Sequence, residues 1–98
     1  MKVQPSNAVD RSGAPVQVGT PVRVLEIASF LKRDLPAEEW QDLQSMVGQV
    51  FQVYEIDAYG SAWVEKVWLM EGGGSRSHSL ALAAHEMEVV LPVAHNRS

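Results

Sequence analysis

The chain has 98 residues, which is the size of one domain with a modest core of its own. It contains no cysteine, so a disulfide scaffold and a thiolate metal site are both excluded. Its formal net charge of −4 does not favour nucleic-acid binding, which depends on neutralising phosphates. No apolar run approaches the roughly 18 residues of a membrane span, and the N-terminal stretch lacks the apolar core of a secretory signal. We therefore expect a cytoplasmic protein with no membrane contact.

The two ends of the chain differ in composition from its centre. Residues 1–18 combine glycine, proline, serine, asparagine and glutamine with scattered valines, so little there can bury an apolar face. We interpret residues 1–18 as a flexible leader, residues 19–91 as the folded domain and residues 92–98 as a flexible tail. The first strand is expected over residues 20–27, with Val22 and Val24 pointing inward.

One short helix is predicted in the long first connection, over residues 36–46. Pro36 suits the first helical position because its missing N–H has no partner there, and Glu38 and Glu39 suit the positive end of the helix dipole. Trp40 and Leu43 then share one face.

The central stretch, residues 47–69, predicts two strands joined by a turn at residues 57–60. Asp57 can accept hydrogen bonds from the backbone ahead of it, and Gly60 can take a positive φ. The apolar alternation before the turn is imperfect, which favours a bent strand that changes face through a bulge. Residues 61–69 carry large apolar groups on both faces, as a strand in a small barrel does.

The last part of the domain is expected to hold a loop, two strands and one tight turn. Residues 71–77 predict a flexible loop, because the triple glycine maximises backbone freedom, and an anion nest is the less favoured alternative. Residues 78–82 and 87–91 predict strands, separated by a single helical turn over residues 83–86.

This order of parts resembles the SH3-like barrels of small prokaryotic proteins. The resemblance rests on an opening GTPVRV strand, a VGxVFxV strand, a turn, a strand with a tryptophan near its end, and the closing SLALAAHEMEVV unit. The layout is similar to that of the ferredoxin–thioredoxin reductase variable chain, the ferredoxin-docking subunit of photosystem I and the barrel of the nitrile hydratase β chain. The resemblance implies a mainly β fold, a five-stranded SH3-like barrel, and a bacterial accessory subunit that docks on a partner.

Catalytic and metal-binding patterns are weak in this sequence. His78, His85 and His95 lack the spacing of metal ligands, and no nucleophile or nucleotide motif occurs. We therefore expect no enzymatic activity, no metal and no cofactor. A small enzyme or metal-binding protein that uses His78 and His85 is kept as the last alternative.

Partner binding is the function that the sequence favours. Trp63 and Trp68 lie an odd number of positions apart, so they face opposite sides of an unbulged strand, and one of them lies outside the barrel. We expect a module that binds another protein or itself. The candidate partner-binding residues are Phe30, Lys32, Arg33, Tyr59, Trp63 and Trp68. A nucleic-acid-binding barrel that uses Arg23, Lys32 and Arg33 is the alternative.

Overall fold

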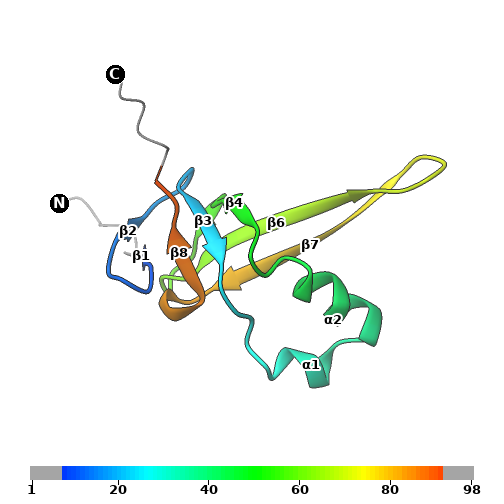
Figure 1. Cartoon of the computed structure of the whole chain (residues 1–98), viewed down its shortest axis with the longest axis horizontal. Coiled ribbons are helices and arrows are strands. Elements are labelled where there is room, and N and C mark those ends of the chain that lie inside the picture. The colour runs from blue at the N-terminus through cyan, green and yellow to red at the C-terminus, as the bar shows by residue number, and fades with distance from the viewer. Residues whose placement is uncertain (1–7, 92–98) are drawn as a thin grey trace.

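The computed structural model describes residues 8–91, which form a mainly β structure with short helices in one connection (Figure 1). The first sheet pairs β1 (Ala8–Val9) with β2 (Pro15–Val16). The second has the order β4-β3-β8, with β3 at Pro21–Val24, β4 at Val50–Gln52 and β8 at Met87–Val89. The third has the order β5-β6-β7, with β5 at Glu55–Ile56, β6 at Ala62–Leu69 and β7 at Ser75–Leu82. The helices are α1 (Leu31–Asp34), α2 (Ala37–Gln44) and the 3₁₀ turn η1 (Ala84–Glu86).

The three sheets and α2 share one apolar core. All strand pairs are antiparallel, and each sheet contributes buried side chains to the same cluster. The largest fully buried side chains are Met46, Leu82, Met87, Val22, Val24, Val53 and Val64. Because these residues come from elements far apart in sequence, the fold depends on long-range packing rather than on any one hairpin.

The predicted change of face in the central stretch occurs at Val53 and Tyr54, between β4 and β5. β4 pairs with β3 in one sheet, whereas β5 pairs with β6 in another. The buried Val53 links the two, since its N–H donates to the Thr20 carbonyl at 3.0 Å and its carbonyl accepts from Gly19 at 2.7 Å. The chain therefore bends from the second sheet into the third here, as the imperfect alternation predicts.

The turn between β5 and β6 is also confirmed. The Asp57 Oδ1 atom accepts hydrogen bonds from the N–H groups of Tyr59 and Ser61, both at 2.9 Å. Gly60 has a φ of 84°, which the left-handed region allows to glycine at little cost. Asp57 and Gly60 thus set the register of β5 and β6.

The prediction of a flexible leader over residues 1–18 is wrong for residues 8–18. Ala8 and Val16 are core residues of the β1–β2 hairpin, and Asp10 is buried in its turn. Two small apolar side chains and one well-bonded carboxylate are enough to fix this polar stretch against β8. Residues 1–7 of the predicted leader and the predicted tail, residues 92–98, lie outside the described residues.

Two further expectations need correction. The first connection holds two helices rather than one, because α1 precedes α2. The predicted loop over residues 71–77 is shorter, because β7 begins at Ser75, where it pairs with Leu69. The strands of residues 8–91 pair in three separate sheets, and this pairing does not close a barrel, so the five-stranded SH3-like barrel stays a prediction. The mainly β class is confirmed, and no helix in that range is long and apolar enough to cross a membrane.

Candidate functional site

A groove of about 890 Å³ lies between β7 and the connection that carries α1 and α2. Figure 1 shows that connection to one side of β7. Apolar side chains of the connection form one wall, and they include Phe30, Leu31, Leu35 and Leu43. β7 forms the other wall, and η1 contributes at one end. A groove of this size with mostly apolar walls is the kind of site that takes a ligand or a partner segment.

The charged side chains that line the groove are acidic. Glu26, Glu39 and Glu86 line it together with His78 and His85, and no lysine or arginine of residues 8–91 does. The Oε1 atom of Glu86 accepts the Ala83 N–H at 2.8 Å, so this carboxylate also holds the η1 turn in place. The groove therefore favours an apolar partner that carries positive charge.

Trp63 is held at the groove by the turn before it. The indole Nε1–H donates to Asp57 Oδ2 at 3.0 Å, and the side chain lines the groove next to Ala81 of β7. The Ser61 N–H and the Trp63 indole N–H lower the pKa of the Asp57 carboxyl, since both bonds favour the charged form. A rigid aromatic side chain is thus presented at the groove with little rotational freedom.

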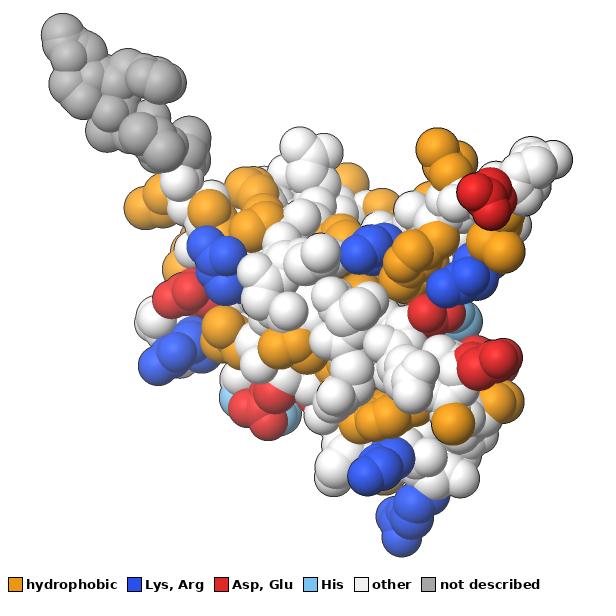
Figure 2. Space-filling view, turned by 45° about the vertical axis from the view of Figure 1, so that its right-hand side comes forward, with side chains coloured by type: hydrophobic (Ala, Val, Ile, Leu, Met, Phe, Trp, Pro, Cys, Tyr) orange, Lys and Arg blue, Asp and Glu red, His pale blue; other side chains and the backbone are white. Residues whose placement is uncertain are grey.

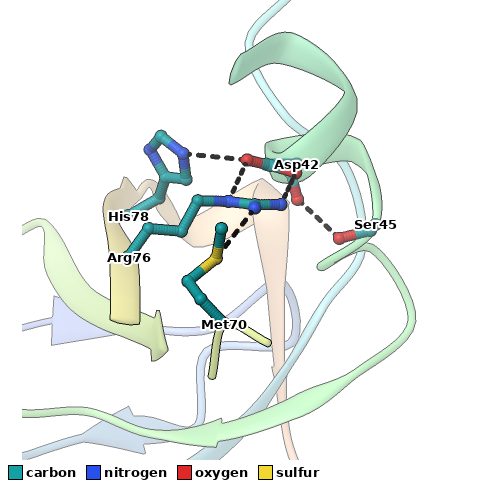
Figure 3. Close-up of polar contacts among 5 residues, drawn as sticks. All are labelled: Asp42, Ser45, Met70, Arg76 and His78. Carbon is teal, nitrogen blue, oxygen red and sulfur yellow. Dashed lines mark hydrogen bonds and ion pairs between the residues drawn. The ribbon is translucent and has the colours of Figure 1, made fainter. Parts of the chain in front are cut away.

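A second cluster, formed by Asp42, Arg76 and His78, ties α2 to β7 (Figure 3). The Arg76 guanidinium donates twice to Asp42, from Nη2 to Oδ1 at 2.9 Å and from Nε to Oδ2 at 3.0 Å. The His78 Nε2 atom lies 3.1 Å from Asp42 Oδ2. The bonds from Arg76, with a smaller effect of His78, lower the pKa of the Asp42 carboxyl. This cluster fixes the distance between the two walls of the groove.

Trp68 occupies a different environment from Trp63, as their odd spacing predicts. Lys66 Nζ lies 5.1 Å from the centre of the Trp68 ring, and the Arg76 guanidinium carbon lies 5.2 Å from it. The His78 ring meets Trp68 edge-on at 5.6 Å between ring centres. Neither indole is fully exposed, so each already packs against its own chain.

The structure brings together two of the six predicted partner-binding residues. Phe30, which is 55% exposed, lies at the groove together with Trp63. Lys32 and Arg33 are exposed on α1 but do not line the groove. Tyr59, at the tip of the β5–β6 turn, is 93% exposed, and Trp68 stacks with the cations described above. The partner-binding role of all six stays a prediction.

Sequence reasoning missed most of the groove. Leu31 and Leu35 are four positions apart on the α1 segment, which is a signal for one apolar helical face. Leu43 of α2 was recognised as apolar, but nothing in the sequence indicates that it faces β7.

The histidines do not form a metal site within residues 8–91. No group of three or more potential ligands lies close enough there to hold a metal ion. His85 is exposed and its Nε2 lies 3.9 Å from Glu86, while His78 is bonded to Asp42. His95 lies outside the described residues.

Comparisons of the chain with known proteins found no matching family, no matching curated protein and no matching solved structure.

Proposed function

We propose that this protein is a non-enzymatic protein-binding module, which acts as an accessory subunit or associates with itself. The groove beside β7 carries the proposal, because two aromatic side chains, Phe30 and Trp63, line it. Aromatic side chains in a concave apolar surface are the usual energetic anchors of protein interfaces. A half-exposed phenylalanine in such a place is stabilised further when a partner covers it.

We further propose that the second and third sheets are the two halves of an SH3-like barrel. The bend at Val53 supports this arrangement, since it joins β4, which pairs with β3, to β5, which pairs with β6. The six strands of these two sheets lie around one core, and they form five segments when β4 and β5 are counted as one bent ribbon, which supports it as well. Strand β8 then closes on β3 after the η1 turn.

The polar groups near the groove support binding rather than catalysis. Glu86 is occupied by the Ala83 N–H, and Asp42 is paired with Arg76. These bonds give both carboxylates a role in the local structure.

The nucleic-acid alternative has less support. Arg23 donates to the Gly48 carbonyl at 3.1 Å and lies 3.9 Å from Glu88, while Lys32 and Arg33 belong to a different element, α1. Figure 2 shows the basic side chains of one face as separate spots between acidic and apolar ones. A phosphate backbone binds best to a continuous basic surface.

The test is affinity capture from the cells that make the protein, with three baits. The baits are the wild type, Phe30→Asp in the groove and Tyr59→Asp on the exposed turn. We expect a partner that the wild type and Tyr59→Asp retain and that Phe30→Asp loses, with light scattering to detect self-association. Identical captured proteins for all three baits, together with a strictly monomeric wild type, would contradict the proposal. Circular dichroism checks that each bait is folded.

A further inference from the structure

Strand β7 has one edge without a backbone partner. Met70 N–H donates to the Gly74 carbonyl at 3.0 Å, which makes this the first hydrogen-bonded pair of the β6–β7 ladder. In an antiparallel ladder such pairs alternate, so Arg76, His78, Leu80 and Leu82 direct their backbone groups toward β6. The residues between them direct their backbone N–H and C=O groups to the opposite edge of β7, and these residues are Ser75, Ser77, Ser79 and Ala81.

Within residues 8–91, no strand and no loop pairs with that edge. β7 pairs only with β6, and the turn and loop hydrogen bonds of this range involve none of its outward-facing residues. Edge strands of this kind are ready to accept another strand, and proteins usually cover or charge them. Here the row of outward backbone groups lies beside serine and alanine side chains, which do not obstruct an approaching strand.

The groove lies along this edge. His78 and Leu80 line it from one face of β7, and Ser79 and Ala81 line it from the other. A pocket that includes both faces of a strand must enclose the strand's edge. The α1–α2 connection stands across from it and supplies the apolar wall.

We propose that the groove binds an extended peptide, which adds to the open edge of β7 as a further strand. This inference rests on the proposed protein-binding function and specifies its mode and partner. Backbone hydrogen bonds to Ser79 and Ala81 give affinity, and alternate side chains of the peptide enter the apolar wall near Phe30 and Leu35. Outward-facing residues of β7 recur every ~6.8 Å, which matches the spacing of alternate residues in the added strand.

The charges of the groove define the class of peptide. Glu26, Glu39 and Glu86 line it, and among the described residues no lysine or arginine does, so the peptide should carry lysine or arginine between its apolar positions. An acidic peptide would bring like charges together at the groove and bind more weakly.

A second copy of the chain fits the edge less well than a peptide does. To pair with β7, a second copy would have to enter the groove with its own α1–α2 connection attached, beside the connection that already stands across from the edge, so the contact would be crowded. A segment without flanking helices avoids this cost.

The test uses an array of short synthetic peptides with apolar residues at alternate positions and lysine, serine or glutamate between them. We expect the lysine class to bind wild type best, and binding to weaken as salt rises. N-methylation of the peptide's edge-facing amides should abolish binding, because the methyl groups block backbone pairing. Failure of every class to bind, or equal binding of the N-methylated peptides, overturns the inference.

The matched protein variants are Ser79→Pro and Ser75→Pro. Both remove an N–H that faces the open edge, so the ladder to β6 is kept, but only Ser79 lines the groove. Ser79→Pro should weaken peptide binding about tenfold, as the loss of one backbone hydrogen bond and its packing predicts, while Ser75→Pro should leave it unchanged. Thermal melting checks that both variants fold.

The outcomes separate the two proposals. If Phe30→Asp abolishes partner capture but Ser79→Pro and the N-methylated peptides behave like their controls, the binding function stands and strand addition is wrong. If the wild type forms a dimer that Ser79→Pro dissolves, the occupant is a second copy and the peptide proposal is overturned. If Phe30→Asp leaves partner capture unchanged and Ser79→Pro leaves peptide binding unchanged, both proposals fail.

Discussion

Asp10 is a buried carboxylate that joins the first hairpin to the last strand. Its Oδ1 atom accepts the N–H groups of Ser12 at 2.8 Å and Ala14 at 2.9 Å, and its Oδ2 atom accepts the Val89 N–H at 2.8 Å. A buried carboxylate is stable only when such donors replace water. The bond to Val89 spans 79 residues, so this side chain joins the two ends of the described range.

We expect Asp10→Ala to destabilise the protein by about 2–4 kcal/mol, because three N–H groups in partly buried bonds lose a charged acceptor. Chemical denaturation measures this loss. Asp34→Ala, at an exposed carboxylate on α1, is the control and should change the stability by no more than about 0.5 kcal/mol. Equal effects of the two substitutions would show that the Asp10 bonds carry no stability.

The same carboxylate predicts a pH dependence. The Val89 N–H, helped by those of Ala14 and Ser12, lowers the pKa of Asp10 below its ordinary value of 3.8, although burial opposes this. A lowered folded-state pKa means that the stabilisation is complete above the ordinary value and is lost as the pH falls through the folded-state value. Acid denaturation followed by circular dichroism should show this loss in the wild type. Asp10→Asn, which has no charge to titrate, should lack that component.

At the scale of the element, the β6–β7 hairpin carries its own stabilising contacts. It extends from the body as a two-stranded ribbon, with apolar side chains on the projecting end (Figures 1 and 2). Leu69 there is 87% exposed. An isolated two-stranded ribbon is marginally stable in water. Lys66, Arg76 and His78 around Trp68 supply the packing that the ribbon lacks from a third strand.

Trp68→Ala should therefore loosen the far half of the ribbon without unfolding the core. Hydrogen exchange should speed up in the residues that pair across this half, such as Lys66 and Trp68 with their β7 partners, while amides of β3 stay protected. Val67→Ala is the control, since Val67 is 52% exposed on the other face of β6. The explanation is wrong if Val67→Ala loosens the ribbon as much as Trp68→Ala does.

The turns show which elements the sequence reveals and which it hides. The residue types of Asp57 and Gly60 predict their turn, and the same spacing recurs at Asp10 and Gly13. The two turns share their bonding: Gly13 N–H donates to the Asp10 carbonyl at 3.0 Å, as Gly60 N–H does to Asp57 at 3.0 Å. The first was missed because β1 and β2 are each two residues long, too short to show alternation.

The groove was hidden for a different reason. One wall comes from α1 and α2, and the other comes from β7. Leu43 and Leu80, which lie on opposite walls, are more than thirty positions apart in the sequence. The sequence singles out Trp63 by its odd spacing from Trp68, and Phe30 by its place next to Lys32 and Arg33. Their meeting at one groove depends on tertiary packing, which includes the pairing of Asp42 with Arg76.

At the scale of the whole molecule, the β1–β2 hairpin belongs to the same folding unit as the two larger sheets. Val16 is buried in the common core, whereas Val18, two positions later, is 65% exposed. If the core is continuous, the loss of methyl groups at Val16 must weaken every element that packs on it. If the hairpin is an independent appendage, the same loss stays local.

Val16→Ala and Val18→Ala decide between these descriptions. Val16→Ala should lower the free energy of unfolding by about 1–2.5 kcal/mol, from lost burial and the cavity left behind, and Val18→Ala should leave it nearly unchanged. In a single cooperative unit, tryptophan fluorescence, which reports on α2 and β6 and not on the hairpin, must give the same shifted midpoint as circular dichroism does. A fluorescence midpoint that does not move while the hairpin melts early would show two separate units. The single core, which holds β7 and α2 at a fixed distance, would then not extend to the first hairpin.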